Sequence, residues 1–251
     1  MRAVRRLHLP DAWSCGEELL VRGSAHHYLA RVLRLEAGQQ LTLFDGMGQE
    51  RTATVRGAER DGLLLALGPL RLSAVPEGEA RVLLLAGMTR GAGLDRVVRE
   101  TTELGVSELC PVLTEHSVAV PGPERRGARQ QRWQRVAVQA ARQCGRATVP
   151  RVHAPLALAQ ACSRLEEEAE SWPVRLVGWP GESHGLSLSP AGGVRGVALL
   201  VGPEGGLSPQ ELQLVEQHGF CRFGLGPRIL RAETAALVAV TLVQHRLGQL
   251  G

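Results

Sequence analysis

From about residue 80 onward, uninterrupted apolar runs alternate with segments in which apolar residues recur at helical spacing. Residues 82–86 form one such run, as is typical of a strand buried on both faces of a parallel sheet. Residues 94–104 have the helical spacing, with arginine and glutamate on the opposite side. Because the two patterns alternate, the sequence predicts an α/β domain with a largely parallel sheet.

The same patterns predict the remaining elements of this region. Further strands are expected at 109–113, 174–178, 197–201 and 222–225, and further helices at 128–144, 156–170, 208–218 and 233–247. Ser208, Pro209 and Glu211 have the spacing of a capped helix start, with serine as N-cap, proline at the first helical position and glutamate closing a capping box.

The N-terminal region has a different pattern, in which short apolar runs are broken by turn residues. Strands are expected at 41–44, 52–55 and 63–67, with the spacing of hairpins, which indicates a small β-barrel or curled sheet. One short helix is expected with Ser24 as its N-cap. Its inward-facing residues should be Tyr28, Leu29, Val32 and Leu33.

These patterns divide the chain into a small β domain at 1–72, a linker at 73–80 and the α/β domain at 81–251. The linker is indicated by the run Ser-Ala-Val-Pro-Glu-Gly at 73–78.

All 29 basic side chains are arginine, because the sequence contains no lysine. Schiff-base, P-loop and general-base lysines are therefore excluded, and any phosphate contact must use the planar fork of arginine. Eight arginines and no acidic residue lie between Arg125 and Arg151. Such a run is often a solvated helix face, but the absence of interleaved carboxylates favours a phosphate-contacting surface.

The five cysteines are scattered and never form a C-x-x-C pair. This spacing argues against a disulfide scaffold and a zinc site, so no metal is expected and the thiols should be free and buried or half-buried. No apolar run approaches 18 residues, so no membrane span is expected. The basic residues at the N-terminus are not followed by a long apolar segment, which predicts a cytoplasmic protein without a secretory signal.

Two Gly-Pro loops near the C-terminus carry the strongest functional signal. The expected strand 197–201 continues into Gly-Pro-Glu-Gly-Gly at 202–206, and ligands of open α/β sheets lie beyond the carboxyl ends of strands. Taken alone, such a turn can be merely a tight connection. It matches neither G-x-G-x-x-G nor a P-loop, which disfavours a nucleotide-dependent oxidoreductase or an ATPase.

The second loop follows the expected strand 222–225 and begins with Gly226-Pro227-Arg228. Ile229 and Leu230 then lie between arginines, just before the last helix. A helix with solvated flanks is one reading of this segment. Beside another Gly-Pro loop, however, it can enclose an adenosine-like ligand, with apolar walls for the ring and backbone groups for its edges.

At this point the sequence resembles a known family, the RsmE-type uridine-N3 methyltransferases of 16S ribosomal RNA, which belong to the SPOUT superfamily. The two most specific matches are V-G-P-E-G-G-L-S at 201–208 and L-G-P-R-I-L-R-A-E-T-A at 225–235. The resemblance continues in M-T-R-G (88–91), T-E-L-G-V (102–106), R-Q-C-G-R-A-T-V-P (142–150) and R-V-L-R (31–34). It therefore spans nearly the whole chain.

The resemblance implies a PUA-like RNA-binding β-barrel domain, followed by a methyltransferase domain whose C-terminal trefoil knot binds S-adenosylmethionine. It also implies a homodimer with the active site near the subunit interface, and 16S rRNA as substrate, which we expect to be met within the assembled 30S subunit. Three loops, 178–180, 202–206 and 225–235, should hold the cofactor. The residues expected to bind it are Gly178, Trp179, Val201, Gly202, Pro203, Glu204, Gly205, Gly206, Leu225, Gly226, Ile229, Leu230, Thr234 and Ala235.

Methyl transfer to uracil N3 requires that its proton be removed or that the resulting anion be stabilised. We assign the stabilising role to Arg231, and Glu233 is either a base or the structural partner of an arginine. The residues expected to contact RNA are Arg31, Arg34, Arg90, Gln143 and Arg146. N3 lies on the Watson–Crick edge, so the target base must be unpaired or flipped out.

The chain departs from the family pattern at Gly93 and Glu100, where lysine is common, at His116, where arginine is usual, and at Arg142, where glutamate is usual. These departures concern substrate contacts and leave the cofactor loops intact. No histidine has a partner at a spacing that indicates catalysis.

Two alternatives remain open from the sequence. The first is an RNA methyltransferase of the same superfamily that modifies a ribose 2′-hydroxyl or a guanine. The second is a non-catalytic RNA-binding protein of ribosome assembly, in which the knot is only a scaffold.

Overall fold

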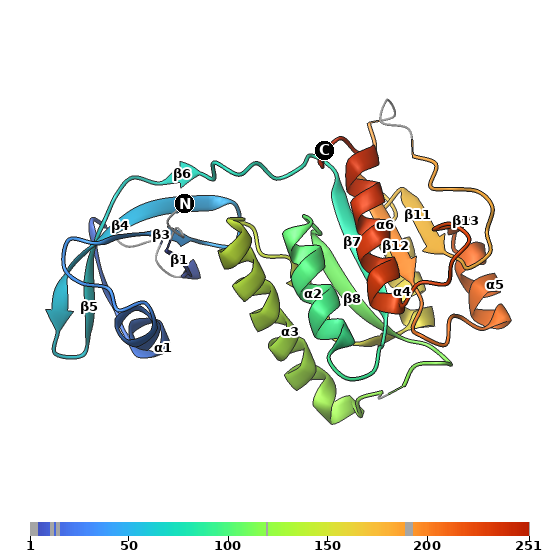
Figure 1. Cartoon of the computed structure of the whole chain (residues 1–251), viewed down its shortest axis with the longest axis horizontal. Coiled ribbons are helices and arrows are strands. Elements are labelled where there is room, and N and C mark those ends of the chain that lie inside the picture. The colour runs from blue at the N-terminus through green and yellow to red at the C-terminus, as the bar shows by residue number, and fades with distance from the viewer. Residues whose placement is uncertain (1–4, 11–12, 14–15, 119, 189–192, 251) are drawn as a thin grey trace. The chain divides into compact units, whose positions relative to one another are not determined.

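The computed structural model describes residues 5–10, 13, 16–118, 120–188 and 193–250, and it divides into two compact units. The N-terminal unit comprises Met1–Glu77 together with Ala141–Val149, and the C-terminal unit comprises Gly78–Ala140 and Pro150–Gly251. Each unit has its own sheet (Figure 1). No helix in the described part of the chain is both long and apolar enough to cross a membrane.

The sheet of the N-terminal unit has the strand order β1-β3-β4-β5-β2, and β6 pairs with β4. β1 runs parallel to β3, and the other pairs are antiparallel. The three expected strands are confirmed as β3, β4 and β5, whereas the short strands β1, β2 and β6 were not predicted. The bounds are β1 Arg6–His8, β2 Glu18–Val21, β3 Gln40–Phe44, β4 Gln49–Glu59, β5 Gly62–Leu67 and β6 Arg71–Leu72.

The expected helix of this unit is present but differs from its prediction. α1 (Gly23–His27) leads directly into a π-helical segment, η2 (Tyr28–Val32), and its N-cap is Arg22, so the prediction of Ser24 as the cap is wrong. Leu29 is fully buried, whereas Val32 is 60% exposed, which contradicts its predicted inward orientation. The wider i→i+5 turn of a π-helix places residues on different faces from those of an α-helix, and this explains the error.

The C-terminal unit is built on a sheet of the order β10-β8-β7-β12-β11-β13, with β9 paired to β8. All of these pairs are parallel, so the α/β prediction is confirmed. The bounds are β7 Arg81–Gly87, β8 Glu108–Leu113, β9 Arg151–Val152, β10 Leu156–Ala157, β11 Val174–Gly178, β12 Gly196–Val201 and β13 Cys221–Phe223. The two-residue strands β9 and β10 were not predicted, because so short a strand has no readable period.

Helices lie on the two faces of this sheet. α6 packs on β7 and β12 and contacts α2, whereas α4 packs on β8 and contacts α5. The buried Gln244 of α6 donates to the carbonyl of Leu104 after α2 at 2.9 Å, and this bond ties the two helices together. The bounds are α2 Gly93–Glu103, α3 Pro123–Cys144, α4 Leu158–Glu167, α5 Pro209–Gln217 and α6 Ala232–Arg246.

The cysteines are free where the structure describes them. Cys110 and Cys162 are buried and Cys144 is half-buried, as expected, but Cys221 is exposed, so the prediction is wrong for this residue. Cys15 lies outside the described residues. Burial raises the pKa of the Cys110 thiol to about 12, which keeps it protonated and unreactive at neutral pH.

A buried polar cluster fastens β8 to the segment after β9. Glu108 accepts a hydrogen bond from His153 Nε2 at 2.6 Å and pairs with Arg81. Arg164 can only donate, so its contact of 3.0 Å with His153 Nδ1 leaves the ring proton on Nε2. Burial by itself raises the pKa of Glu108, but the bond from His153 and the nearby charges of Arg81 and Arg164 outweigh it, so this pKa lies below its ordinary value.

We predict that Glu108→Gln lowers the free energy of unfolding at neutral pH by about 2 kcal/mol, because it weakens a set of buried hydrogen bonds. A folded-state pKa below the unfolded one gives stability that is present at higher pH and is lost as pH falls through the folded-state value. The difference between the variant and the wild type should therefore shrink in acid. Urea unfolding at a series of pH values measures it.

The matched control is Glu167→Gln, because Glu167 is an exposed residue of α4 and its replacement should change little. A difference between Glu108→Gln and the wild type that persists unchanged below the carboxyl titration range would contradict the role assigned to Glu108.

Candidate functional site

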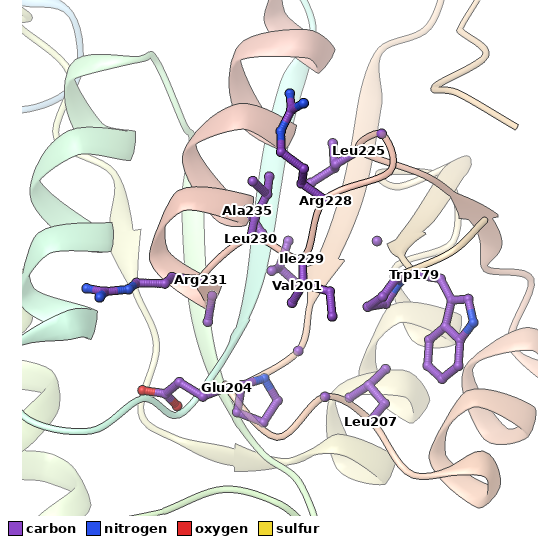
Figure 2. Close-up of a pocket in the computed structure, with 17 residues that line it drawn as sticks. Trp179, Val201, Glu204, Leu207, Leu225, Arg228, Ile229, Leu230, Arg231 and Ala235 are labelled. Carbon is purple, nitrogen blue, oxygen red and sulfur yellow. The ribbon is translucent and has the colours of Figure 1, made fainter. Parts of the chain in front are cut away.

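A cavity of about 320 Å³ lies beyond the carboxyl ends of three neighbouring strands. β11, β12 and β13 end at Gly178, Val201 and Phe223, and their parallel pairing brings these ends to one edge of the sheet. The loops that follow the three strands line the cavity (Figure 2). The three loops predicted from the sequence are therefore brought together around one space.

The predicted cofactor residues line this cavity, with the exceptions of Gly205 and Thr234. Thr234 is exposed on α6, and Gly205 packs instead against His116. Five further residues line the cavity: Leu207, which lies outside the three predicted loops, and four members of those loops that were not individually predicted to bind cofactor, Pro180, Arg228, Arg231 and Ala232.

The first Gly-Pro loop is a tight turn held close to the sheet. The Gly206 N–H donates to the carbonyl of Pro203 at 2.9 Å, and Gly206 has a φ of +71°, which glycine adopts without strain. A Cβ on Gly87, the last residue of β7, would lie 2.3 Å from the nitrogen of Pro203. Gly87 therefore makes room for the loop, a role that its position at the end of an apolar run could have indicated.

Two carboxylates fasten this loop and its helix to neighbouring loops. Glu204 accepts a hydrogen bond from the backbone N–H of Arg90, after β7, at 3.0 Å. Glu211 completes the predicted capping box with Ser208 and also accepts from the N–H of Glu115, after β8, at 2.8 Å. The segments that follow β7, β8 and β12 are thus joined at one edge of the sheet.

The second Gly-Pro loop and the segment after β11 form an apolar wall. Trp179 donates its backbone N–H to the carbonyl of Phe223 at 2.9 Å, which fixes the start of the β11 segment. Figure 2 shows Trp179, Leu225, Ile229 and Leu230 around the cavity. Ile229 is 90% exposed although it lines the cavity, so this part of the wall is accessible from solvent.

The opposite side of the cavity is polar. Glu204 and Arg231 extend away from Trp179, toward the same side in Figure 2. Arg231 is the N-cap residue of α6, and the N-terminus of a helix carries a partial positive charge. This side therefore combines the carboxylate of Glu204, which accepts from the N–H of Arg90, with a guanidinium and the positive end of α6, and the last two suit an anionic or electron-rich group.

Glu233 does not line the cavity. The pKa of Arg96 on α2 is raised chiefly by its hydrogen bond with Glu100 and further by the charge of Glu233. Both roles considered for Glu233, as a base or as the structural partner of an arginine, stay predictions.

The residues predicted to contact RNA are in different environments. Arg31, Arg34, Arg90 and Gln143 are exposed. Arg146, in contrast, is only 5% exposed, and its guanidinium forms two hydrogen bonds with the carboxylate of Glu77, at 2.7 and 3.0 Å. Its fork is occupied within the N-terminal unit by Glu77, which gives Arg146 a structural role, and its contact with RNA stays a prediction.

Some arginines of the run 125–151 are paired with carboxylates that lie outside the run. Arg132 pairs with Asp95 of α2, and Arg125 lies 3.6 Å from Glu124. The compensating charges come from outside the run. Within the described residues, no cluster of histidine, cysteine or carboxylate side chains could hold a metal ion.

Comparison with known proteins places this geometry in a family. An RNA methyltransferase domain model matches residues 76–244, and an RNA methyltransferase PUA domain model matches residues 21–67. The chain therefore belongs to the RNA methyltransferase family that the first of these models describes. "Ribosomal RNA small subunit methyltransferase E" of Synechocystis is 32% identical over 88% of the chain and 71% of the relative. The Mycobacterium bovis protein of the same name is 31% identical over 94% of the chain and 88% of the relative.

Two solved structures with S-adenosylmethionine superpose over nearly the whole chain. A putative methyltransferase of Legionella pneumophila has 29% identity and a TM-score of 0.85, and covers 96% of this chain and 97% of its own. Ribosomal RNA small subunit methyltransferase E of Neisseria gonorrhoeae has 28% identity, a TM-score of 0.84 and the same coverage. The predicted order, a PUA-like domain followed by a SPOUT-type methyltransferase domain, is confirmed, and the trefoil knot stays a prediction.

We predict that Gly87→Ala weakens binding of S-adenosylmethionine, the ligand of the two solved relatives, by at least about tenfold, or 1.4 kcal/mol. The added Cβ would displace Pro203 and with it the loop that lines the cavity. Titration calorimetry measures the affinity, and circular dichroism checks that the fold is retained.

Gly127→Ala is the matched control, because a Cβ on Gly127 of α3 meets nothing within 4 Å. Equal affinities of Gly87→Ala and wild type would show that the contact between Gly87 and Pro203 does not position the loop.

Proposed function

We propose that this chain is an S-adenosylmethionine-dependent methyltransferase that modifies N3 of a uridine in the 16S rRNA of the small ribosomal subunit. The observation that carries the proposal is the cavity, which the three loops form together in a chain of this family. The names of the relatives support ribosomal RNA of the small subunit as substrate. N3 of uracil is the finer part of the proposal and rests on the resemblance of both Gly-Pro loops to the uridine-N3 family.

The cavity fits the cofactor by its size and by the chemistry of its walls. Leu225, Ile229, Leu230 and Val201 offer apolar surface to a purine ring, and backbone groups of the Gly-Pro loops can meet the polar edges of the ring. When bound, S-adenosylmethionine supplies a methyl group on a positively charged sulfur, open to attack by a nucleophilic nitrogen.

The polar side of the cavity suits the second reactant, the uracil base. Uracil N3 carries a weakly acidic proton, so the reaction is favoured by groups that stabilise the anion left when this proton departs. Arg231 and the N-terminus of α6 can do so electrostatically, because both are already in place before negative charge develops. Holding N3 in line with the methyl group supplies a further reduction of the barrier.

The proposal includes a homodimer and the assembled 30S subunit as the form of the substrate. A groove between α2 and α6 supports a dimer, because four apolar residues line it beside Glu100, Glu103 and Thr241, and one of the four, Leu242, is 37% exposed. An rRNA substrate also implies that the protein works in the cytoplasm. Light scattering of the purified chain measures the number of subunits.

The decisive experiment is methylation of small-subunit particles and of naked 16S rRNA in vitro, followed by nucleoside analysis. We expect 3-methyluridine, with particles as the better substrate. Methyl groups on ribose or guanine would refute the N3 assignment while leaving the enzyme class intact. Absence of transfer together with absence of S-adenosylmethionine binding would favour a non-catalytic assembly protein.

We predict that Arg231→Ala lowers the rate of methyl transfer by about 100-fold or more, as expected for removal of one preorganised electrostatic group. Cofactor affinity should remain largely unchanged, because the side chain extends away from the apolar wall. Single-turnover kinetics and calorimetry measure the two quantities separately.

Arg231→Lys serves as the comparison, because it keeps the charge and removes the planar fork, and its rate should lie between those of the alanine variant and the wild type. Equal losses of rate and of cofactor affinity in Arg231→Ala would make Arg231 a cofactor-binding residue.

A further inference from the structure

The orientation of Trp179 decides the shape of the apolar wall of the cavity. Trp179 lines the cavity directly after β11, on the side away from Arg231 (Figure 2). It is half-buried and packs against the core cluster between the sheet and the helices α4 and α5. A side chain at the border of a core has fewer neighbours than one inside it, so a further contact is needed to fix its ring.

Arg222 of β13 supplies this contact. Val177 of β11 lies opposite Arg222 in the parallel pairing, and Trp179 follows Val177 by two residues, which places it on the same face of the sheet. The guanidinium carbon of Arg222 lies over the Trp179 ring, 5.9 Å from its centroid. A cation is attracted to a tryptophan ring within about 6 Å, so this contact restrains the ring only where the guanidinium is itself held in place.

Glu216 of α5 holds the guanidinium. Its carboxylate accepts a hydrogen bond from Arg222 Nε at 2.5 Å. This bond is the main reason why the pKa of Arg222 is raised and the pKa of Glu216 is lowered, so both groups are charged at neutral pH. The charge of Glu182, which lies in the same segment as Trp179, raises the pKa of Arg222 further. Arg222 is therefore anchored to the helix that follows the first Gly-Pro loop.

The backbone of the segment after β11 is fixed against the end of β13. The N–H of Gly224 donates to the carbonyl of His184 at 2.8 Å. A Cβ on Gly224 would lie 2.0 Å from the carbonyl oxygen of Glu182, so the two segments approach closely there. With the backbone held in this way, the freedom left to Trp179 is that of its side chain, which is the part that Arg222 contacts.

We propose that Arg222 is a positioning residue for S-adenosylmethionine, which holds the Trp179 ring in the orientation that lines the cavity and is itself held by Glu216. Neither Arg222 nor Glu216 lines the cavity, so both act on the cofactor through Trp179. A wall that is ordered before binding spares the cofactor the entropic cost of ordering it. The inference rests on the proposed function in taking S-adenosylmethionine as the ligand.

The test compares the affinities of the full-length wild type and of Arg222→Gln for S-adenosylmethionine by titration calorimetry. The dissociation constant should rise about fivefold, as expected when one large side chain must be ordered on binding. In methylation assays the loss should appear in KM for S-adenosylmethionine and much less in kcat, because Arg222 does not line the cavity. An unchanged dissociation constant overturns the proposal.

A double-mutant cycle with Trp179→Leu tests whether Arg222 acts through the ring. Trp179→Leu should weaken binding by itself, and the addition of Arg222→Gln should then weaken it no further. If Arg222→Gln causes the same loss in the Trp179→Leu chain as in the wild type, Arg222 acts by another route and the proposal is wrong.

The ring can also be followed without cofactor, by acrylamide quenching of tryptophan fluorescence. Trp133 and Trp172 are fully buried, so quenching reports chiefly on Trp13 and Trp179. Arg222→Gln should increase quenching in the wild-type chain and leave it unchanged in the Trp179→Leu chain. Equal quenching of Arg222→Gln and the wild type would contradict the restraint that Arg222 is proposed to place on the ring.

Three further variants complete the comparison. Glu216→Gln should give a smaller loss of affinity than Arg222→Gln, because the guanidinium is released but not removed, and it decides the test if Arg222→Gln fails to fold. Arg222→Lys keeps the charge without the planar guanidinium, and its affinity should lie between those of Arg222→Gln and the wild type. Arg195→Gln is the control, because it removes an exposed arginine before β12, at the edge of the sheet opposite the cavity. An equal loss in Arg195→Gln would mean that net charge alone sets the affinity.

The outcomes separate this inference from the proposed function. A wild-type chain that binds S-adenosylmethionine more tightly than Arg222→Gln but transfers no methyl group to RNA would refute the proposed function alone. Normal methyl transfer together with equal affinities would refute the role of Arg222 alone. Melting curves of every variant check that folded chains are compared.

Discussion

The parallel register of β11 with its two neighbours is the constraint on which the site depends. β11 pairs with β12 on one side and β13 on the other, and Gly178 lies opposite Phe223 at the carboxyl end. Three chain segments far apart in sequence must therefore leave the sheet at one edge. If one strand were reversed, its loop would emerge at the other edge and the cavity would lose a wall.

The division of the cavity into an apolar wall and a polar side follows from what comes after each strand. The segments after β11 and β13 carry Trp179, Ile229 and Leu230, and α6 begins with Arg231 immediately beyond them. The polar side is also where Glu204 of the first Gly-Pro loop accepts a hydrogen bond from the backbone N–H of Arg90. This hydrogen bond connects the first Gly-Pro loop to the segment after β7, so the two reactants of a methyl transfer would be positioned by a connected set of loops.

The elements with a long, clear period were predictable, and so was the ring of residues around the cavity. The alternation after residue 80 indicated the α/β sheet, and the Gly-Pro loops lie where strand ends must meet. The features that the sequence did not reveal have local or long-range causes. Val32 is exposed because a π-helix has a different period from the assumed α-helix. Arg146 finds its partner, Glu77, 69 residues away in sequence, and such a pairing leaves no trace in the sequence around either residue.

A chain without lysine uses one kind of side chain for every cationic task, so composition cannot say which arginines are structural and which are functional. The structure separates them by their partners. Arg6, Arg81 and Arg146 are held by carboxylates that are themselves at least partly buried. If such an arginine turned away to bind a ligand, the buried carboxylate would lose a partner, which costs free energy. Arg34 and Arg231 have no such ion pair among the described residues, and both stand at helix ends. A basic surface predicted from charge counts alone would have included Arg146 and overlooked the difference between arginines held by carboxylates and arginines without such a partner.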